Sequence, residues 1–279
     1  MSVPPEWNSA AVPAIEIRDL STRFGDVVIH RDINLEVPPG QMLGLVGGSG
    51  SGKTTLLREI VGLLAPSAGM VKLFGHAVLD ADPQRRRMVR RRFGMLFQQG
   101  ALFSALSVFD NIAFPLRELR LLDEALIRDL VLLKLAMVEL EPRHSRLMPA
   151  ELSGGMARRV ALARAIALDP MLIMYDEPFA GLDPISLGVI GQLIRKLNDA
   201  LGATTIMVTH DIQESLLIVD YIYFMSDGKV VALGTPDEIR ASRHPFVHQF
   251  VFAEADGPVP FHYPAPPLAH ELLGKGARP

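Results

Sequence analysis

Leu43-Gly-Leu-Val-Gly-Gly-Ser-Gly-Ser-Gly-Lys-Thr-Thr-Leu-Leu57 is the stretch that decides the fold of this chain. It begins inside an apolar run, 42–46, that has the length of a buried strand, and from Thr54 onward its apolar residues recur at helical spacing. Between strand and helix, the spacing Gly-x-x-x-x-Gly-Lys-Thr is that of a phosphate-binding P-loop. A strand that leads into a helix through such a loop is typical of an α/β protein with a parallel sheet.

The loop has the composition that a polyphosphate site needs. Its glycines let successive backbone N–H groups turn toward one point, and the helix adds the positive end of its dipole. We therefore expect a nucleotide polyphosphate here, with the Lys53 ammonium at the β- and γ-phosphates and the Thr54 hydroxyl on the accompanying Mg²⁺. The residues expected to contact the nucleotide are Gly47, Gly48, Ser49, Gly50, Ser51, Gly52, Lys53, Thr54 and Thr55. The alternative is a Gly/Ser-rich turn, which does not explain why every motif position matches.

Composition indicates a globular protein of one large domain or two modest ones. The chain has 279 residues, of which 49% are hydrophobic, enough for a substantial core. Its net charge of −3 argues against a nucleic-acid partner, for which a clustered basic excess is usual. There is no cysteine, so disulfides and thiolate metal ligands are excluded. Neither a signal-peptide pattern nor an apolar run of about 18 residues is evident, so we expect no membrane-spanning segment.

Six arginines crowd the segment that follows Pro83, namely Arg85, Arg86, Arg87, Arg90, Arg91 and Arg92. Such a cluster can contact anionic lipid or nucleic acid, but it also occurs on the solvated face of a helix. Because the chain as a whole is slightly acidic, we favour the solvated helix.

Apolar and polar residues alternate in two stretches before the loop, which predicts strands with one wet face at 14–20 and 33–37. We expect these strands to be antiparallel. Beyond the loop, strands are predicted at 71–74, 93–97, 171–175 and 204–208, a hairpin at 221–225 and 229–233, and helices at 108–116, 124–140, 154–168 and 184–200. Strands that alternate with helices imply βαβ units and a parallel sheet.

An apolar strand at 171–175 leads directly into Asp176 and Glu177. Both carboxylates then stand at the carboxyl edge of a parallel sheet, where ligands bind. If this strand neighbours the loop, Asp176 would hold Mg²⁺ through its water shell, and Glu177 would orient or deprotonate the water that attacks the phosphate. Acidic strand ends are often merely solvated, but here they accompany a phosphate loop.

At Leu152-Ser153-Gly154-Gly155-Met156, followed by Ala-Arg-Arg-Val-Ala-Leu-Ala-Arg-Ala165, the chain resembles the signature motif of the ATP-binding cassette (ABC) ATPases. The resemblance extends over 14–242. By itself Ser153 is a good N-cap, with glycines that permit a close approach to the helix N-terminus. The family resemblance adds that Ser153, Gly154 and Gly155 contact ATP. The family usually has glutamine where this chain has Met156, so the role of the Met156 side chain is open.

Four more positions match the family. Gln98 resembles the Q-loop glutamine, a ligand of Mg²⁺ and water, and His210 resembles the switch histidine that contacts the γ-phosphate. Asp183 belongs to a stretch like the D-loop, which touches the opposite subunit. Phe24 occupies the place of the aromatic residue that stacks on adenine, although it could also belong to the core. The resemblance thus implies that Glu177, His210, Gln98 and Lys53 are catalytic, and that Thr54, Gln98 and Asp176 bind the metal.

The resemblance also implies a fold: a P-loop NTPase (RecA-like) parallel-sheet core, with an N-terminal antiparallel β subdomain and an inserted α-helical subdomain at about 99–155. We expect an N-terminal extension at 1–13, the ABC ATPase domain at 14–242, and a C-terminal extension at 243–279 with a proline-rich tail. In this family the signature serine of one chain faces the P-loop of another. The resemblance therefore implies a homodimer that holds two ATP molecules between Lys53 of one copy and Ser153 of the other.

Three further stretches narrow the family. The segments 96–103 and 108–118 resemble the ATPases of transporters that work with mammalian-cell-entry lipid-binding proteins, and the tail at 255–264 resembles the ATPase of a phospholipid transporter that maintains outer-membrane lipid asymmetry. This resemblance implies a peripheral ATPase on the cytoplasmic face of the inner membrane, with a permease, a mammalian-cell-entry lipid-binding protein and a small STAS-domain protein as partners. Phe103, Phe109 and Phe114 could line a groove for a permease helix or belong to the subdomain core. Phe261 and Tyr263 could anchor the tail or lie in a disordered segment.

Two alternatives to lipid transport remain. A cassette of this type could serve another substrate, such as an amino acid or a metal complex, because the membrane partner determines what is carried. A soluble cassette could instead act on DNA or ribosomes, but such proteins usually carry a long coiled-coil insertion or two cassettes. A simple P-loop kinase does not account for the signature motif or for His210.

Overall fold

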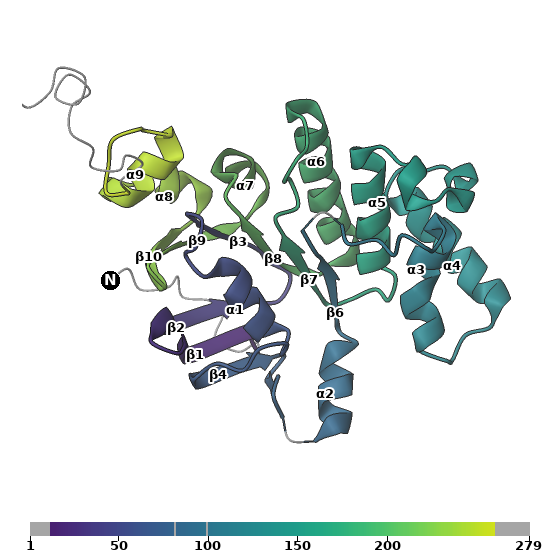
Figure 1. Cartoon of the computed structure of the whole chain (residues 1–279), viewed down its shortest axis with the longest axis horizontal. Helices are drawn as coiled ribbons and strands as arrows, with labels where there is room; N and C mark the ends of the chain where they lie inside the picture. The colour runs from purple at the N-terminus through teal and green to yellow at the C-terminus, as the bar shows by residue number, and fades with distance from the viewer. Residues whose placement is uncertain (1–11, 81, 99, 260–279) are drawn as a thin grey trace, which may run out of the picture.

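The computed structural model describes residues 12–80, 82–98 and 100–259, which form two sheets and the helices around them (Figure 1). The strands are β1 (Ile15–Phe24), β2 (Val27–Val37), β3 (Met42–Gly47), β4 (Ala68–Leu73), β5 (His76–Ala77), β6 (Phe93–Leu96), β7 (Leu172–Asp176), β8 (Thr204–Thr209), β9 (Tyr221–Ser226) and β10 (Lys229–Gly234). The α-helices are α1 (Lys53–Ile60), α2 (Pro83–Arg90), α3 (Val108–Glu118), α4 (Glu124–Met137), α5 (Gly154–Ala165), α6 (Pro184–Leu201), α7 (Ile212–Ile218), α8 (Pro236–Arg240) and α9 (Pro245–Phe252). Short 3-10 helices lie at Pro142–Arg146 and Pro149–Glu151.

The larger sheet has six strands in the order β10-β9-β3-β8-β7-β6. β3 pairs in parallel with β8 and β9, and β7 pairs in parallel with β6 and β8. Gly47, Asp176 and Thr209 end β3, β7 and β8, so the phosphate loop shares one sheet edge with the other two strand ends. β8 lies between β3 and β7, so the strand with the two carboxylates is not the direct neighbour of the loop strand.

The strands of this sheet are buried on both faces. Met42 and Val46 of β3 belong to a core with the helices that follow β6, whereas Leu43 and Leu45 belong to a second core with α1 and the smaller sheet. Because successive side chains point to opposite faces, a strand that is covered on both sides has a continuous apolar sequence. This burial explains why the apolar run at 42–46 predicted the strand correctly.

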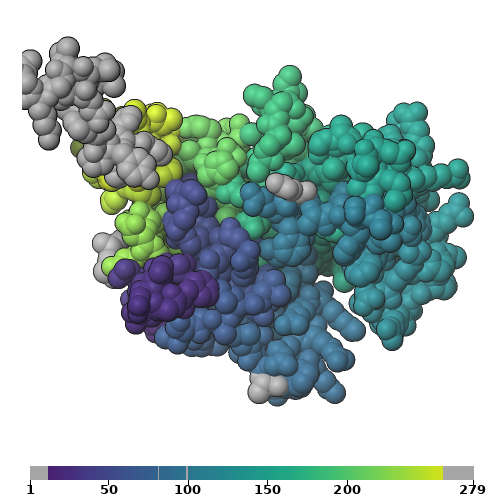
Figure 2. All heavy atoms as spheres, in the orientation of Figure 1, coloured from purple at the N-terminus to yellow at the C-terminus, as the bar shows by residue number. Residues whose placement is uncertain are grey.

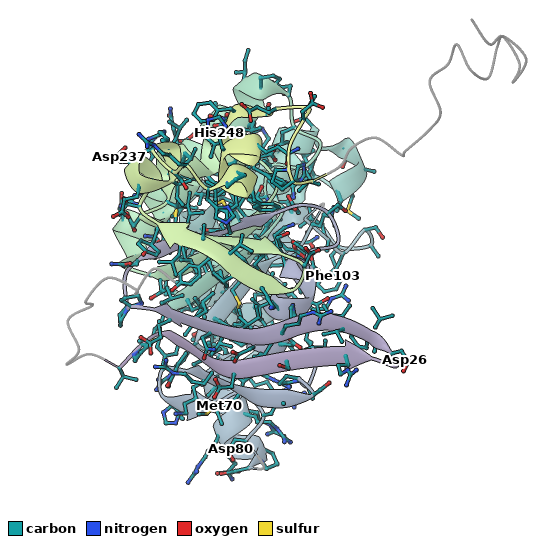
Figure 3. All side chains as sticks on the ribbon, turned by 90° about the vertical axis from the view of Figure 1, so that its left-hand side faces the viewer. Asp26, Met70, Asp80, Phe103, Asp237 and His248 are labelled. Atoms are coloured by element: carbon teal, nitrogen blue, oxygen red, sulfur yellow. The ribbon has the colours of Figure 1, made fainter. Side chains whose placement is uncertain are left out.

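The smaller sheet, in the order β2-β1-β4-β5, is antiparallel, as predicted for the region before the loop. Its first two strands are longer than predicted, because β1 continues to Phe24 and β2 starts at Val27. They form a hairpin around Gly25, whose φ of +59° suits a tight turn, and Asp26. Figure 3 shows Asp26 at the tip of this hairpin. The hairpin brings Phe24 to the end of an exposed turn.

α3, α4 and α5 follow β6 and form one end of the molecule, drawn in teal in Figures 1 and 2. The predicted helices at 108–116, 124–140 and 154–168 are all present, with C-terminal ends shifted by up to three residues. The arginine-rich segment forms α2, capped by Asp82, and buries Val89 while most of its arginines are exposed. The solvated helix face expected there is confirmed.

The predicted hairpin of β9 and β10 is present, but α7, α8 and α9 were not predicted. Each is eight residues or shorter, so its stability depends on tertiary packing. Phe246 and Phe250 of α9 pack edge-on against Phe224 of β9, with ring centroids 6.3 and 6.4 Å away. Residues 1–11 and the tail positions Phe261 and Tyr263 lie outside the described residues.

None of the described helices has the length and apolar character needed to span a bilayer.

Candidate functional site

The phosphate loop leaves the carboxyl end of β3 and enters α1 without a side-chain cap. A Cβ on Gly47 would stand 2.2 Å from the carbonyl oxygen of Met225, so the loop starts against the backbone of β9. Gly50 and Gly52 have φ of +77° and +98°, which only glycine adopts without strain. The first N–H groups of a helix have no intrahelical partner, so α1 presents free donors to the loop. The loop is a concave donor surface suited to phosphate.

Lys53 is the first residue of α1, and its side chain folds back into the loop. Its Nζ donates to the carbonyl oxygens of Gly47 and Gly48 at 2.7 and 2.9 Å. The side chain is buried, and this burial lowers the pKa of Lys53 despite the opposing effect of Glu177 and Asp176. A bound phosphate can replace these carbonyls as the acceptor, with a stronger charge-assisted hydrogen bond.

Thr54 and Asp176 meet across the sheet edge. The Thr54 hydroxyl on α1 donates to Asp176 Oδ1 at 3.3 Å, although β8 separates β7 from the strand that leads into the loop. Asp176 is 6% exposed, and its burial raises the pKa of the carboxyl, with the nearby Glu177 as a further cause. A buried carboxylate beside a hydroxyl, with its charge insufficiently compensated, is an arrangement of hard oxygen ligands that a Mg²⁺ ion would stabilise.

Glu177 follows β7 directly and has φ of +49°, a strained conformation for a non-glycine residue. Its carboxylate Oε2 lies 2.8 Å from Nδ1 of His210 and accepts a hydrogen bond from the His210 backbone N–H at 3.3 Å. His210 follows β8, so the neighbouring strands β7 and β8 bring the two residues together. Asp211 stands on the far side of the imidazole, with Oδ1 3.9 Å from Nε2. Glu177 is held at the sheet edge in a strained backbone conformation, and such strain is typical of functional positions.

Gln98 lies just past β6, at the same edge of the sheet, and is exposed. Phe24 is 51% exposed at the end of β1, so its side chain is not part of the core. This exposure removes the alternative of Phe24 as a packing residue. Both side chains remain accessible to a ligand.

Ser153 and Asp183 cap the helices α5 and α6. The Ser153 hydroxyl accepts from the Met156 N–H at 3.2 Å, and a Cβ added to Gly154 or Gly155 would meet no atom within 4 Å. Asp183 accepts from the backbone N–H groups of Ile185 and Ser186, and hydrogen bonds from Ser186 lower its pKa. Ser153, Gly154 and Asp183 are exposed. The structure thus gathers Lys53, Thr54, Asp176, Glu177 and His210 at one edge and leaves the signature turn open.

Sequence reasoning missed one group of residues next to the loop. His30 of β2 and Glu59 of α1 are completely buried, and His30 contacts the carbonyl of Gly52. The available signal was a histidine in an alternating strand and a glutamate on the apolar side of α1, between Leu57 and Ile60. A charged residue at an apolar helical position indicates a buried partner.

The chain is similar to known proteins in sequence and in fold. The family described as ABC transporter matches residues 30–180. Over 259 residues the chain is 52% identical to the intermembrane phospholipid transport system ATP-binding protein MlaF of Haemophilus influenzae, across 93% of this chain and 98% of that one. It is 48% identical to the Escherichia coli K12 protein of the same name, across 93% and 96% of the two chains. A dimeric ATP-binding cassette solved in a post-hydrolysis state with ADP and Pi is similar at a TM-score of 0.72 and 32% identity, across 80% of this chain and 98% of that one.

Proposed function

Because this chain belongs to the ABC transporter family, we propose that it is the ATP-hydrolysing subunit of a transporter that moves phospholipid between the inner and outer membranes and so maintains outer-membrane lipid asymmetry. The observation that carries the proposal is 52% identity to a phospholipid transport ATP-binding protein over nearly the full length of both chains. The phosphate loop and the carboxylates at one sheet edge supply the chemistry that such a subunit needs.

In the proposed reaction, water attacks the γ-phosphorus of ATP while the bond to the bridging oxygen breaks, which yields ADP, phosphate and a proton. We assign Glu177 the task of orienting this water and accepting its proton, since its carboxylate lies at the sheet edge. His210, 2.8 Å from that carboxylate, would hold it in position and contact the γ-phosphate. Lys53 would exchange its loop carbonyls for the phosphates.

Thr54, Asp176 and Gln98 would hold the Mg²⁺ ion. The contact between Thr54 and Asp176 supports this assignment, as does the raised pKa of the buried Asp176 carboxyl, which a cation would relieve. When bound, the ion would neutralise part of the phosphate charge. Phe24 would stack on the adenine from its exposed position on the β1–β2 hairpin.

The active form we propose is a homodimer in which Ser153 and Gly155 of one copy close over the phosphate loop of the other, with Asp183 near the contact. The open surroundings of the signature glycines support it, because nothing in the described chain covers them. A related cassette at 32% identity was solved as a dimer.

A permease segment is the proposed occupant of an apolar groove between α3 and β6. The groove has a volume of about 690 Å³, and its lining includes Phe97, Phe103 and Phe114. These three rings are 41–44% exposed, and Arg164 stacks over Phe103 at 5.4 Å. Phe109 is not part of the groove, because it packs on the core under Arg117. Rings this exposed favour a docking surface over a closed core.

Two aspartate variants test the groove, one inside it and one outside it as the control. Phe114→Asp should abolish capture of the permease by the tagged chain, because it puts a carboxylate in the apolar groove, while ATP binding stays within about twofold. Leu121→Asp, at a 76% exposed position outside the groove, is the control. Equal permease capture by both variants would show that the groove is not the docking site.

We also propose a mammalian-cell-entry lipid-binding protein and a small STAS-domain protein as partners, and a peripheral location on the cytoplasmic face of the inner membrane. The resemblance of the sequence to that subgroup supports these assignments. The tail from 254 onward would contribute to assembly, so deletion of 254–279 should weaken the complex. An unchanged complex would exclude that role.

The decisive experiment is to purify the tagged chain from native membranes and to identify the bound subunits and lipids by mass spectrometry. We expect a permease with co-purified phospholipid. A permease that carries only polar solutes would contradict the lipid assignment and leave the ATPase chemistry intact.

A further inference from the structure

Three buried polar side chains lie between the smaller sheet and the helix that follows the phosphate loop. Thr22 is 1% exposed, and His30 and Glu59 are 0% exposed. Thr22 and His30 stand directly opposite each other in the β1–β2 ladder, so they point to the same face. Glu59 lies seven residues after Gly52, two turns along α1, which places it on the side of that helix where the loop ends.

Their contacts form a continuous chain that ends on the phosphate loop. The Thr22 hydroxyl donates to Oε1 of Glu59. The other carboxylate oxygen, Oε2, is 3.0 Å from Nδ1 of His30, an ion-pair distance without the alignment of a hydrogen bond. Nε2 of His30 is 3.1 Å from the carbonyl oxygen of Gly52. Because a carbonyl oxygen only accepts, Nε2 carries the proton of this contact.

The Gly52 carbonyl controls the direction of a phosphate donor. It also accepts the Leu56 N–H at 2.9 Å, as the first hydrogen bond of α1. In a planar trans peptide, the carbonyl and the following N–H point in opposite directions. A Gly52 carbonyl held toward His30 therefore turns the Lys53 N–H away from His30, toward the expected phosphate. A Cβ on Gly52 would stand 2.6 Å from Nε2, so the ring is packed directly against the loop.

Backbone from another part of the fold covers this histidine. The Arg31 N–H donates to Gly228 in the β9–β10 turn at 2.8 Å, and a Cβ on Gly228 would stand 2.0 Å from the carbonyl of Ile29. Figure 3 shows β10 beside the β1–β2 hairpin. The polar chain is therefore closed off from water. Burying polar side chains is costly relative to apolar residues of the same volume, which points to a role for these three beyond stability.

We propose that His30 is a positioning residue for the phosphate loop: it fixes the Gly52 peptide so that the loop donors face the phosphates, and Glu59 and Thr22 hold its ring. Thr22 precedes Phe24 by two residues, so the same contacts join the loop to the hairpin that carries the proposed adenine platform. The inference rests on the proposed function, because it takes ATP as the ligand of this loop.

Two amide substitutions separate the contacts of the ring. His30→Gln retains a donor at the reach of Nε2 and loses the ring nitrogen beside Glu59, whereas His30→Asn retains a group at the reach of Nδ1 and cannot reach Gly52. We expect His30→Asn to raise KM for ATP roughly five- to tenfold, the effect of one buried hydrogen bond, with kcat within about twofold. His30→Gln should restore KM to within about twofold. His76→Asn, at an exposed position on β5, is the surface control.

A double apolar variant keeps the test valid if a single variant folds poorly. His30→Leu with Glu59→Leu replaces both buried polar partners together by apolar side chains, so its melting temperature should equal or exceed that of the unmodified chain. Its KM for ATP should nevertheless rise as it does in His30→Asn. A purely structural role predicts instead that KM follows the melting temperature.

The measurements are KM and kcat for ATP, direct binding of a fluorescent ATP analogue, and the melting temperature of the full chain. If the unmodified chain binds ATP and the variants have KM values within twofold of its own, the inference about His30 is overturned and the proposed function is not. Equal increases for His30→Gln and His30→Asn also overturn it. An unmodified chain that binds no ATP overturns the proposed function and the inference with it.

Discussion

The phosphate loop and the signature turn are both glycine-containing connections into a helix, but their surroundings differ. In the phosphate loop, Lys53 is 7% exposed and a Cβ on Gly52 would collide with His30. In the signature turn, a Cβ on Gly154 or Gly155 would meet nothing within 4 Å. The phosphate loop packs against its own chain at Gly47 and Gly52, whereas the signature turn presents an open surface. This difference supports the proposal that the phosphate loop is one half of the ATP site and that the signature turn faces a second copy of the chain.

The largest effect, a loss of ATP turnover, is expected from Glu177→Gln. The amide keeps the size of the side chain but cannot accept a proton, so ATP turnover should fall about 10²- to 10⁴-fold while ATP binding persists. A bound but unhydrolysed nucleotide should keep two copies together, which light scattering in MgATP can measure. Glu118→Gln, at an exposed position on α3, is the control. Full turnover in Glu177→Gln would remove the assignment of this residue.

Ser153→Asp tests the signature turn without changing the phosphate loop of the same chain. Aspartate is as good an N-cap as serine, so α5 and the melting temperature should be unchanged. Its charge would face the phosphates of the ATP bound to the second copy, and turnover should fall roughly a hundredfold because like charges repel across a contact. Affinity of the isolated chain for ATP should not change. A loss of ATP affinity in the monomer would mean that Ser153 acts within its own chain.

Lys53→Met tests the phosphate loop. Removal of the ammonium should weaken ATP binding about 10- to 100-fold, the range for hydrogen bonds to charged groups. The nucleotide-free chain should be as stable as before or more stable, because burial already disfavours the charged form and lowers the pKa of Lys53. Calorimetric titration with ATP and thermal melting check the two effects. A strongly destabilised apo variant would show that the lysine supports the loop structurally.

The smallest of these effects is a change in the stability of the apo chain, which we expect from Asp176→Asn. Because burial raises the pKa of Asp176, its stabilising contribution is fully present below the ordinary pKa and is lost as the pH rises through the raised value. At neutral pH the carboxylate is therefore unfavourable, and the amide should raise the melting temperature of the apo chain by about 2–4 °C, which corresponds to about 1 kcal/mol. The gain should shrink as the pH approaches about 4. A gain that persists unchanged at low pH would have another cause.

Two kinds of prediction succeeded from sequence for a physical reason. The strand at 42–46 and the helices at 108–116 and 184–200 have side-chain periods that reflect burial on particular faces, and burial is what the pattern records. The short helices α7, α8 and α9 escaped prediction because helices of this length are stabilised by their neighbours. The extension of β1 and β2 escaped for a similar reason, since Gly25 and Asp26 form a turn that only the pairing of the flanking strands makes evident.

The sequence by itself determined the phosphate loop and the signature turn, because each motif consists of adjacent residues whose spacing is the chemical requirement. It also determined that two carboxylates end a strand. Only the tertiary structure decided that Glu177 contacts His210, that Thr54 reaches Asp176 across an intervening strand, and that His30 and Glu59 lie buried beneath Gly52. Strand order and helix packing set such contacts between residues far apart in the chain, and local patterns carry no information about them.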